Sequence, residues 1–311
     1  MLFDLDSLPA STNEDLKNLK EIHSNLDPIY LNVHMRDDWK EVREYLNFWW
    51  GKYQNFADNN FIYEFKRSFS SRVWELYLFS LLSTSGFNFI KQNKTRTNPD
   101  FKIEIDNRFL FIEAVAPNSG VDHNKVITTS DLLKDLPSGT IVTRTSTRDE
   151  SNHPKLRRIL SAIKSKCRLS FSPEIRDNDH YVIAINGANI EGWSADIDLI
   201  MEAVDGIDPS PSFTKNKDGS LSGPFYRRRT FILNSQGTNQ IDIAVFDHSE
   251  TENVSAVIFF GSDIYNSILG NSSNEVIVVH NPNAKEGKKI NHDVFSNFTQ
   301  FYKREGAWYK K

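Results

Sequence analysis

The order of helices and strands across residues 71–186 restricts the fold of this chain more than any other feature. The expected elements are a helix at 72–85, strands at 87–91, 100–105 and 108–115, a helix at 154–169 and a strand at 181–186. The first helix is apolar nearly all round, which indicates that it is buried. Asp106-Asn107 predicts a tight turn between the second and third strands. The sequence therefore predicts an α/β fold with a mixed central sheet flanked by helices.

The flanking regions differ from this core. A capping box at Ser11 and Glu14 predicts a helix to about residue 24, and Asp37 or Asp38 begins a helix that reaches Trp50, with a stop at Gly51. Further elements are a loop at 117–151, a helix at 193–204, a loop at 205–224 and strands at 230–234, 241–246, 254–260 and 275–279. We expect a helical N-terminal region (1–69) and one domain (70–311), with its core at 70–186 and a C-terminal extension (187–311) whose strands extend the sheet.

Composition excludes several classes of protein. The chain has 311 residues, of which 39% are hydrophobic and 25% charged, as in an ordinary globular protein. No apolar run approaches the roughly 20 residues that span a bilayer. The acidic start (Asp4, Asp6) lacks the basic residues of a secretory signal, and the single Cys167 excludes an internal disulfide and a multi-cysteine zinc site. These features lead us to expect a cytoplasmic protein without a membrane partner.

Charge is unevenly distributed along the chain. The net charge is −4, which argues against a strongly basic coat for nucleic acid, yet residues 144–176 hold nine basic and three acidic side chains. Smaller basic clusters occur at Arg227–Arg229 and in the tail, at Lys303-Arg304 and Lys310-Lys311. Such clusters usually form a solvated face, but nearby aromatic residues also permit contact with nucleic acid.

Three acidic residues lie where acids are costly. Glu75 lies in the apolar helix, where it needs either an ion pair with Arg72 or a metal ion. Glu113 is a lone acid on a strand that is apolar on both faces, and Asp100 follows Pro99 at the start of a strand. The Asp106-Asn107 turn would bring Asp100 and Glu113 face to face, where their charges repel unless a cation lies between them. A hard divalent ion, Mg²⁺ or Mn²⁺, would resolve that conflict.

The order and spacing of these residues resemble the PD-(D/E)xK nuclease superfamily, whose fold is restriction-endonuclease-like. The family motifs are a helical Glu, Pro-Asp and Glu-x-Lys, which read here as Glu75, Pro99-Asp100 and Glu113-Ala-Val115. The resemblance covers about residues 70–186. It implies a restriction-endonuclease-like core and a Mg²⁺-dependent endodeoxyribonuclease, with a setting in phage defence or a mobile element.

The chain departs from the family at Val115, where the motif has lysine. In some members that lysine has moved to the following helix, which carries Lys164 and Lys166 here, on opposite sides of its apolar stripe. Periodicity does not choose between them. The segment Ser161–Lys166 resembles the helix of related bacterial proteins in which the second lysine is the fixed one, and this likeness favours Lys166.

The resemblance implies a role for each residue. Asp100 and Glu113 would hold the metal, Glu75 would bind a second ion or orient a water, and Lys166 would stabilise charge on the phosphate or help to deprotonate water. DNA is the expected partner, and a homodimer fits the same reading. Two alternatives remain: a catalytically silent module of the same fold that binds DNA or a protein, favoured by Val115, and a metal-free carboxylate pair acting on a glycosidic bond.

Overall fold

The computed structural model describes residues 1–3, 25–92, 98–118, 120, 152–189, 197–208, 212–234, 236–270 and 275–311. The helix expected at 11–24 and most of the loop expected at 117–151 lie outside these residues. No helix of the described part is long and apolar enough to cross a membrane.

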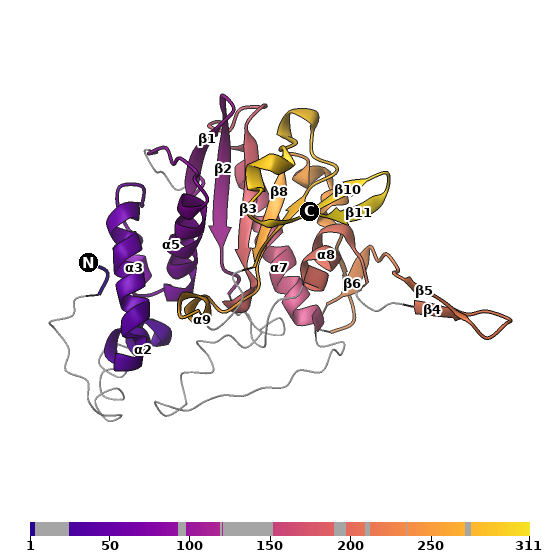
Figure 1. Ribbon diagram of the computed structural model, residues 1–311, viewed down its shortest axis with the longest axis horizontal. Coiled ribbons are helices and arrows are strands. Elements are labelled where there is room, and N and C mark those ends of the chain that lie inside the picture. Colours follow the sequence, from indigo (N-terminus) through magenta and orange to yellow (C-terminus); the bar gives the residue numbers. More distant parts are fainter. Residues whose placement is uncertain are drawn as a thin grey trace.

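A seven-stranded mixed sheet forms the centre of the molecule, in the order β1-β2-β3-β8-β9-β10-β11 (Figure 1). The strands are β1 (Phe101–Ile105), β2 (Arg108–Val115), β3 (His180–Asn186), β8 (Ala256–Phe260), β9 (Val276–His280), β10 (Thr299–Arg304) and β11 (Ala307–Lys310). β2, β3 and β8 run parallel, and β1 and β9 pair antiparallel with β2 and β8. The expected α/β fold with a mixed central sheet, extended by C-terminal strands, is confirmed.

Helices cover both faces of this sheet. The helices are α2 (Pro28–Met35), α3 (Lys40–Tyr53), α4 (Phe61–Phe65), α5 (Phe69–Thr84), α7 (Asn152–Cys167), α8 (Ile197–Asp205) and α9 (Ile264–Ile268). Side chains alternate along a strand, so Ile112 and Ala184 join the apolar core under α2–α5, whereas Phe111 and Ile183 join the core under α7 and α8. The N-terminal helices thus share one core with α5 and the sheet.

The central helix α5 is buried, as its apolar sequence predicts. Ten of its sixteen residues are buried. Trp74 Nε1 donates a hydrogen bond to the carbonyl oxygen of Ala184 at 3.0 Å, which fixes the helix against β3. The helix begins at Phe69, three residues before the expected start at Arg72. At this first residue the backbone N–H of Phe69 donates to Asp27 Oδ2 at 3.2 Å, which anchors the amino-terminal end of α5.

The β1–β2 hairpin turns at Asp106 and Asn107, as expected. Both residues have positive φ, 48° and 62°, which is the backbone of a two-residue hairpin turn. The register pairs Phe101 with Ile112. Asp100 directly precedes Phe101, and its Oδ2 accepts a hydrogen bond from the backbone N–H of Ala114, so it lies beside Glu113 at the open end of the hairpin.

Several sequence-based boundaries are wrong. The strand expected at 87–91 is only an isolated bridge between Phe89 and Ile103. The helix expected to stop at Gly51 continues to Tyr53, because the buried Tyr53 side chain belongs to the core. The expected strand at 241–246 ends at Asp242.

Other elements were not expected at all. The loop expected at 205–224 contains an antiparallel hairpin of β4 (Ser212–Lys215) and β5 (Leu221–Phe225). The strands expected at 230–234 and 241–246, by contrast, are present as β6 (Phe231–Leu233) and β7 (Gln240–Asp242), which pair in a separate small ribbon. The basic tail forms β10, which pairs with β9, and the edge strand β11. The side chains of β11 are largely exposed and most of those of β10 are only half-buried, so the tail lacks the apolar alternation from which strands are predicted.

Candidate functional site

Glu113 is the only acid on β2, and the structure places it at the sheet face covered by α7. Its exposed fraction is 5%. The neighbours on the same face, Phe111 and the paired strand residue Ile183, are fully buried apolar side chains. A carboxylate in such surroundings needs a cationic partner or a proton.

Lys166 supplies that partner. Its Nζ lies 2.5 Å from Glu113 Oε1, and its side chain is 31% exposed. Lys164, two positions earlier on α7, points elsewhere, and its Nζ donates to the carbonyl oxygen of Asp242 at 3.3 Å. Two helical positions are separated by about 200°, so only one of the two lysines can reach β2.

The electrostatics of this pair favour an ion pair. Burial raises the pKa of Glu113, while the charge and hydrogen bond of Lys166 oppose that rise and the nearby Glu75 adds to it. Burial by itself would lower the pKa of Lys166, but the attraction of Glu113, its hydrogen bond and the charge of Asp100 outweigh burial and raise it. Lys166 is therefore an ammonium group at neutral pH.

Asp100 completes the group at the mouth of the hairpin. Its Oδ2 accepts a hydrogen bond from the backbone N–H of Ala114 at 2.8 Å, which ties it to the strand residue next to Glu113. Its side chain is half-buried and lines the same open cleft as Glu113 and Lys166. Asp100 also raises the pKa of Lys166, so the two carboxylates act on one ammonium group.

Glu75 is close to the group but is held by other residues. Arg72, three positions earlier on α5, contacts Glu75 Oε2 at 2.6 Å, and the hydroxyl of Tyr53 donates a hydrogen bond to Oε1. Arg72 also forms ion pairs with Asp58, at 3.0 Å, and with Glu64. One guanidinium thus pairs with three carboxylates at the cleft, and these charges raise the pKa of Arg72 although burial opposes them.

These groups line a cleft of about 770 Å³. Its polar walls come from Asp58, Glu64, Arg72, Asp100, Glu113 and Lys166. The cleft lies beside the amino-terminal end of α5 and the carboxyl end of β2, and its lining also includes residues of α4 and α7. A volume of this order suits a small molecule or a few linked residues of a polymer.

The donor set fits one hard divalent cation. Mg²⁺ is usually held by one or two carboxylates together with water and substrate phosphates, which matches Asp100 and Glu113. No three His, Cys, Asp or Glu side chains of the described residues form a ready cage for a metal. Glu75 is engaged by Arg72 and Tyr53, so the geometry provides for one ion more readily than for two.

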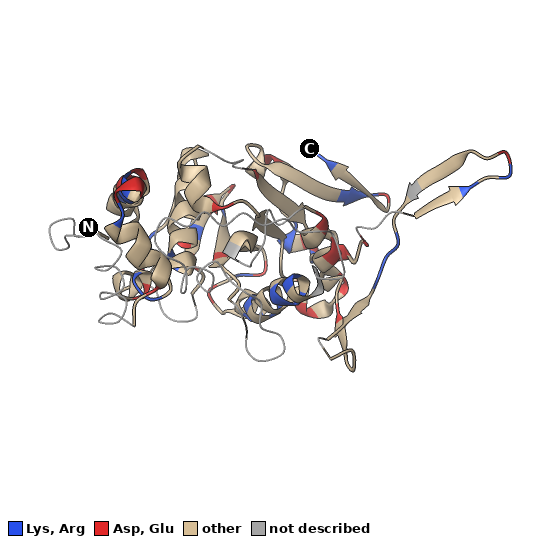
Figure 2. Ribbon diagram, turned by 90° about the horizontal axis from the view of Figure 1, so that it is seen from below, with Lys and Arg blue, Asp and Glu red and all other residues tan. Residues whose placement is uncertain are grey.

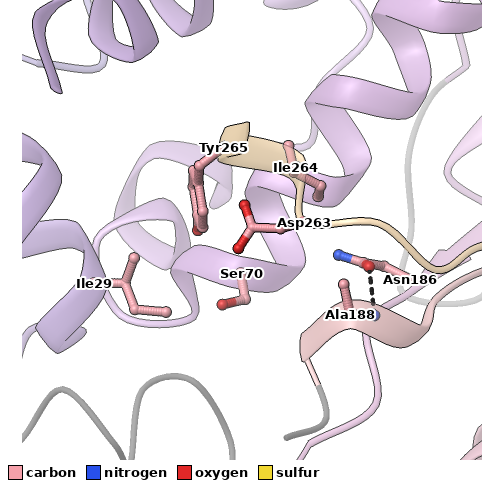
Figure 3. A pocket seen from close by; sticks show the side chains of 7 residues that line it. All are labelled: Ile29, Ser70, Asn186, Ala188, Asp263, Ile264 and Tyr265. Carbon is pink, nitrogen blue, oxygen red and sulfur yellow. Dashed lines mark hydrogen bonds between the residues drawn. The ribbon is translucent and has the colours of Figure 1, made fainter. Parts of the chain in front are cut away.

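The small hollow in Figure 3 is a poorer candidate. It lies at the carboxyl ends of β3 and β8 and holds about 20 Å³, which is space for about one water molecule. Its polar side chains also have structural tasks, because Asp263 caps α9 through the N–H of Asn266 at 2.9 Å and Asn186 accepts from the N–H of Ala188 at 3.0 Å.

Part of the basic segment at 144–176 lies on α7. Residues 144–151 are outside the described part, and the described basic residues include Lys155, Arg157 and Arg158. In Figure 2 these cations colour the helix at the centre of the view. Arg158 donates to the carbonyl oxygen of Asn118 at 2.9 Å, just beyond β2, so positive charge continues along this edge of the sheet.

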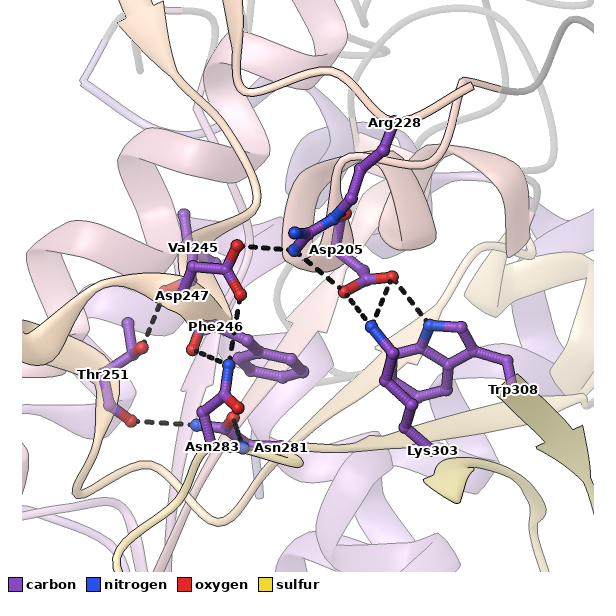
Figure 4. Close-up of polar contacts among 10 residues, drawn as sticks. All are labelled: Asp205, Arg228, Val245, Phe246, Asp247, Thr251, Asn281, Asn283, Lys303 and Trp308. Atoms are coloured by element: carbon purple, nitrogen blue, oxygen red, sulfur yellow. Dashed lines mark hydrogen bonds and ion pairs between the residues drawn. The ribbon is translucent and has the colours of Figure 1, made fainter. Parts of the chain in front are cut away.

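The other basic clusters are partly used inside the fold (Figure 4). Asp205, which is buried, accepts from Lys303 Nζ at 3.0 Å, from Trp308 Nε1 at 2.8 Å and from Arg228 at 3.2 Å. Arg229 contacts Asp208 at 2.5 Å. Lys303 and Trp308 therefore join α8 to β10 and β11, and Arg228 and Arg229 join α8 and the residues just after it to the segment before β6. The prediction of a solvated basic face did not include these internal contacts.

Sequence reasoning missed several residues of the cleft. Tyr53, Asp58 and Glu64 belong to the N-terminal helices and the loop between them, and no periodicity links them to Glu75. The spacing of Arg72 and Glu75 suggested their ion pair. The contacts of Asp58 and Glu64 with the same guanidinium depend on how the N-terminal helices pack, which the sequence pattern does not indicate.

Comparison with protein-family models, curated proteins and solved structures finds no match for this chain. The resemblance to the PD-(D/E)xK nucleases therefore remains a prediction, carried by the residues and their geometry alone.

Proposed function

We propose that this protein is a divalent-metal-dependent deoxyribonuclease that hydrolyses phosphodiester bonds in the cleft between α5, α7 and β2. The observation that carries the proposal is that Asp100, Glu113 and Lys166 line one cleft, with Lys166 paired to Glu113 and Asp100 bound to the N–H of the next residue, Ala114. Two carboxylates and one ammonium group in an open polar cleft are the groups that hydrolysis of a phosphodiester requires.

Each residue has a distinct task in this proposal. Asp100 and Glu113 would hold a Mg²⁺ or Mn²⁺ ion, which supplies polarisation of a phosphoryl oxygen and a lower pKa for the attacking water. The water oxygen forms a bond to phosphorus, the ester P–O bond breaks, and the leaving oxygen takes up a proton. The Lys166 ammonium, which contacts Glu113 in the cleft, stabilises the negative charge that develops on the phosphate oxygens.

Glu75 acts through Arg72 in this proposal. Its carboxylate fixes the guanidinium at the cleft wall, where a planar cation can pair with a phosphate oxygen of the substrate. This positioning role agrees with the contacts of Glu75 better than direct binding of a second ion, which would have to displace Arg72.

A catalytically silent module that binds DNA is the second candidate. Val115 stands where the motif has lysine, and Lys166 reaches Glu113 from another element. In a silent module that contact would be only a buried ion pair that stabilises the fold.

A cleavage assay with matched variants tests the proposal. We expect the purified chain to nick supercoiled plasmid with Mg²⁺ or Mn²⁺ and not with EDTA. Asp100→Asn and Glu113→Gln should abolish nicking, whereas Glu104→Gln, an exposed acid on the same hairpin, should leave it unchanged.

The outcomes separate the candidates. Equal nicking by the wild type and Asp100→Asn would identify a contaminating nuclease and overturn the proposal. Salt-sensitive DNA binding without metal-dependent nicking would favour the silent module.

A further inference from the structure

A two-stranded arm projects from the body of the molecule (Figure 1). The arm is residues 212–227, which comprise β4, β5, the turn between them and the first two residues after β5, and residues 228–230 join it to β6. An isolated two-stranded ribbon is at best marginally stable in water, so a projecting one needs additional support. Two features provide it, an anchored base and an aromatic contact on one face.

The base of the arm is fixed to α8. The backbone N–H of Arg229 donates to the carbonyl oxygen of Gly206 at 2.7 Å, and the N–H of Asp208 donates to Arg227 at 2.8 Å. Gly206 has φ +72°, and a Cβ there would meet the Arg229 carbonyl oxygen at 2.0 Å, so only glycine permits this approach. The side chain of Arg228 adds contacts to Asp205 and Asp247 (Figure 4).

The arm exposes apolar side chains that the body does not cover. Phe213 is 58% exposed, Leu221 70% and Tyr226 57%. Six of the twelve exposed large apolar side chains of the described residues fall between Phe213 and Leu233. The Phe213 ring lies against Gly223, where φ is +138° and a Cβ would meet the ring at 2.9 Å. The ring is thus held in place at the surface.

Cations without an internal partner accompany these rings. Lys215, Lys217 and Arg227 form no ion pair with any residue of the described part, in contrast to Arg228 and Arg229. The acid of the turn, Asp218, accepts hydrogen bonds from Ser220. The arm therefore carries an uncompensated positive charge, although the chain as a whole has a net charge of −4.

We propose that this arm binds a single-stranded segment of DNA. Exposed rings interleaved with free cations are the arrangement on which bases stack and phosphates are neutralised. The inference rests on the proposed action on DNA and adds to it a substrate class with unpaired bases. A dimer formed by two identical arms is less favourable, because an isologous contact would bring the same lysines together.

Binding measured with and without the arm side chains tests this inference. We would measure anisotropy of a labelled single-stranded oligonucleotide, and of its duplex, with the full-length chain in EDTA. Phe213→Ala and Tyr226→Ala should each weaken single-strand binding roughly 5- to 150-fold. The matched control is Phe48→Ala, an equally exposed ring on α3, which should bind as the wild type.

Salt dependence tests the cations separately. Combined Lys215→Ala, Lys217→Ala and Arg227→Ala should reduce the slope of log K against log salt by about 2, at about 0.7 for each phosphate contact on a single strand. Unchanged affinity and slope in both sets of arm variants would overturn the inference. So would an arm-dependent shift from dimer to monomer in sedimentation without an effect on binding.

The two proposals fail in distinguishable ways. If Asp100→Asn binds single strands through the arm but the wild type cleaves no DNA, the binding role of the arm is supported and the nuclease proposal is contradicted. If the wild type cleaves DNA and the arm variants bind and cleave normally, the nuclease proposal is supported and the binding role of the arm is contradicted.

Discussion

Lys166 Nζ lies 2.5 Å from Glu113 Oε1, although 53 residues separate the two side chains in the chain. The contact joins α7 to β2 at the cleft, where Glu113 also accepts a backbone hydrogen bond from Asp100. It also distinguishes Lys166 from Lys164, whose Nζ faces the carbonyl oxygen of Asp242.

The first prediction concerns these two lysines. Lys166→Ala should lower the rate of Mg²⁺-dependent nicking by about 10²- to 10³-fold, because it removes a cation placed where phosphate charge develops. Lys164→Ala, on the same helix, should cleave at the wild-type rate. Melting curves establish that both variants fold, and a loss confined to Lys164→Ala would contradict the assignment.

The hairpin at the site was predictable because its information is local. Asp106-Asn107 predicts the turn, the turn fixes the register, and the register places Asp100 beside Glu113. Periodicity could not decide which lysine reaches Glu113, because Lys164 and Lys166 flank the same apolar stripe. The way in which α7 packs on the sheet selects Lys166.

The parts that sequence did not predict depend on contacts distant in the chain. Arg72 gathers Asp58, Glu64 and Glu75 because α4 and the loop before it pack beside α5, and no repeat in the sequence reports that packing. The arm was expected to be a loop, because its Gly, Ser and Lys residues are typical of turns, and a ribbon exposed on both faces shows no burial pattern.

The second prediction concerns metal binding. Mg²⁺ should stabilise the wild type against heat or urea, by about 2.7 kcal/mol at a concentration 100 times the dissociation constant. Asp100→Asn and Glu113→Gln should lose most of that increment, because each replaces one of the two proposed anionic ligands by a neutral amide. Glu104→Gln should keep it. An undiminished increment in Asp100→Asn would place the ion elsewhere.

The third prediction concerns Arg72, which forms ion pairs with three carboxylates. Without metal, Arg72→Met should destabilise the fold by about 3 kcal/mol, because the buried Glu75 loses its cation. Mg²⁺ should restore part of this loss, since a divalent ion can take the place of the guanidinium among the acids.

The control for Arg72 is Arg67→Met, whose guanidinium lies over the exposed Tyr63 ring. Urea unfolding of both variants, with and without Mg²⁺, measures the effect. An equal loss for Arg72→Met in both conditions would show that the acids do not accept an ion there.

The last prediction concerns pH and the helix that anchors the arm. Burial raises the pKa of Glu202 to about 7, Arg229 partly opposes this rise, and Asp208 and Asp198 add to it. Its Oε1 accepts no hydrogen bond from the described residues, and Arg229 lies 3.7 Å away. The folded protein thus holds a proton on Glu202 that the unfolded chain releases near the ordinary pKa of a glutamate.

The sign of the pH dependence follows from that difference. Between the unfolded and the folded pKa the native state binds more protons, so the free energy of unfolding falls as pH rises through this window. Glu202→Gln should abolish this fall in the free energy of unfolding. The variant should exceed the wild type by about 3 kcal/mol near pH 8, but by almost nothing below the unfolded pKa. Urea titrations across this range measure it, with the exposed Glu305→Gln as control. A gain that is the same at every pH would mean that Glu202 is not protonated in the native state, and that its carboxylate is instead stabilised by Arg229.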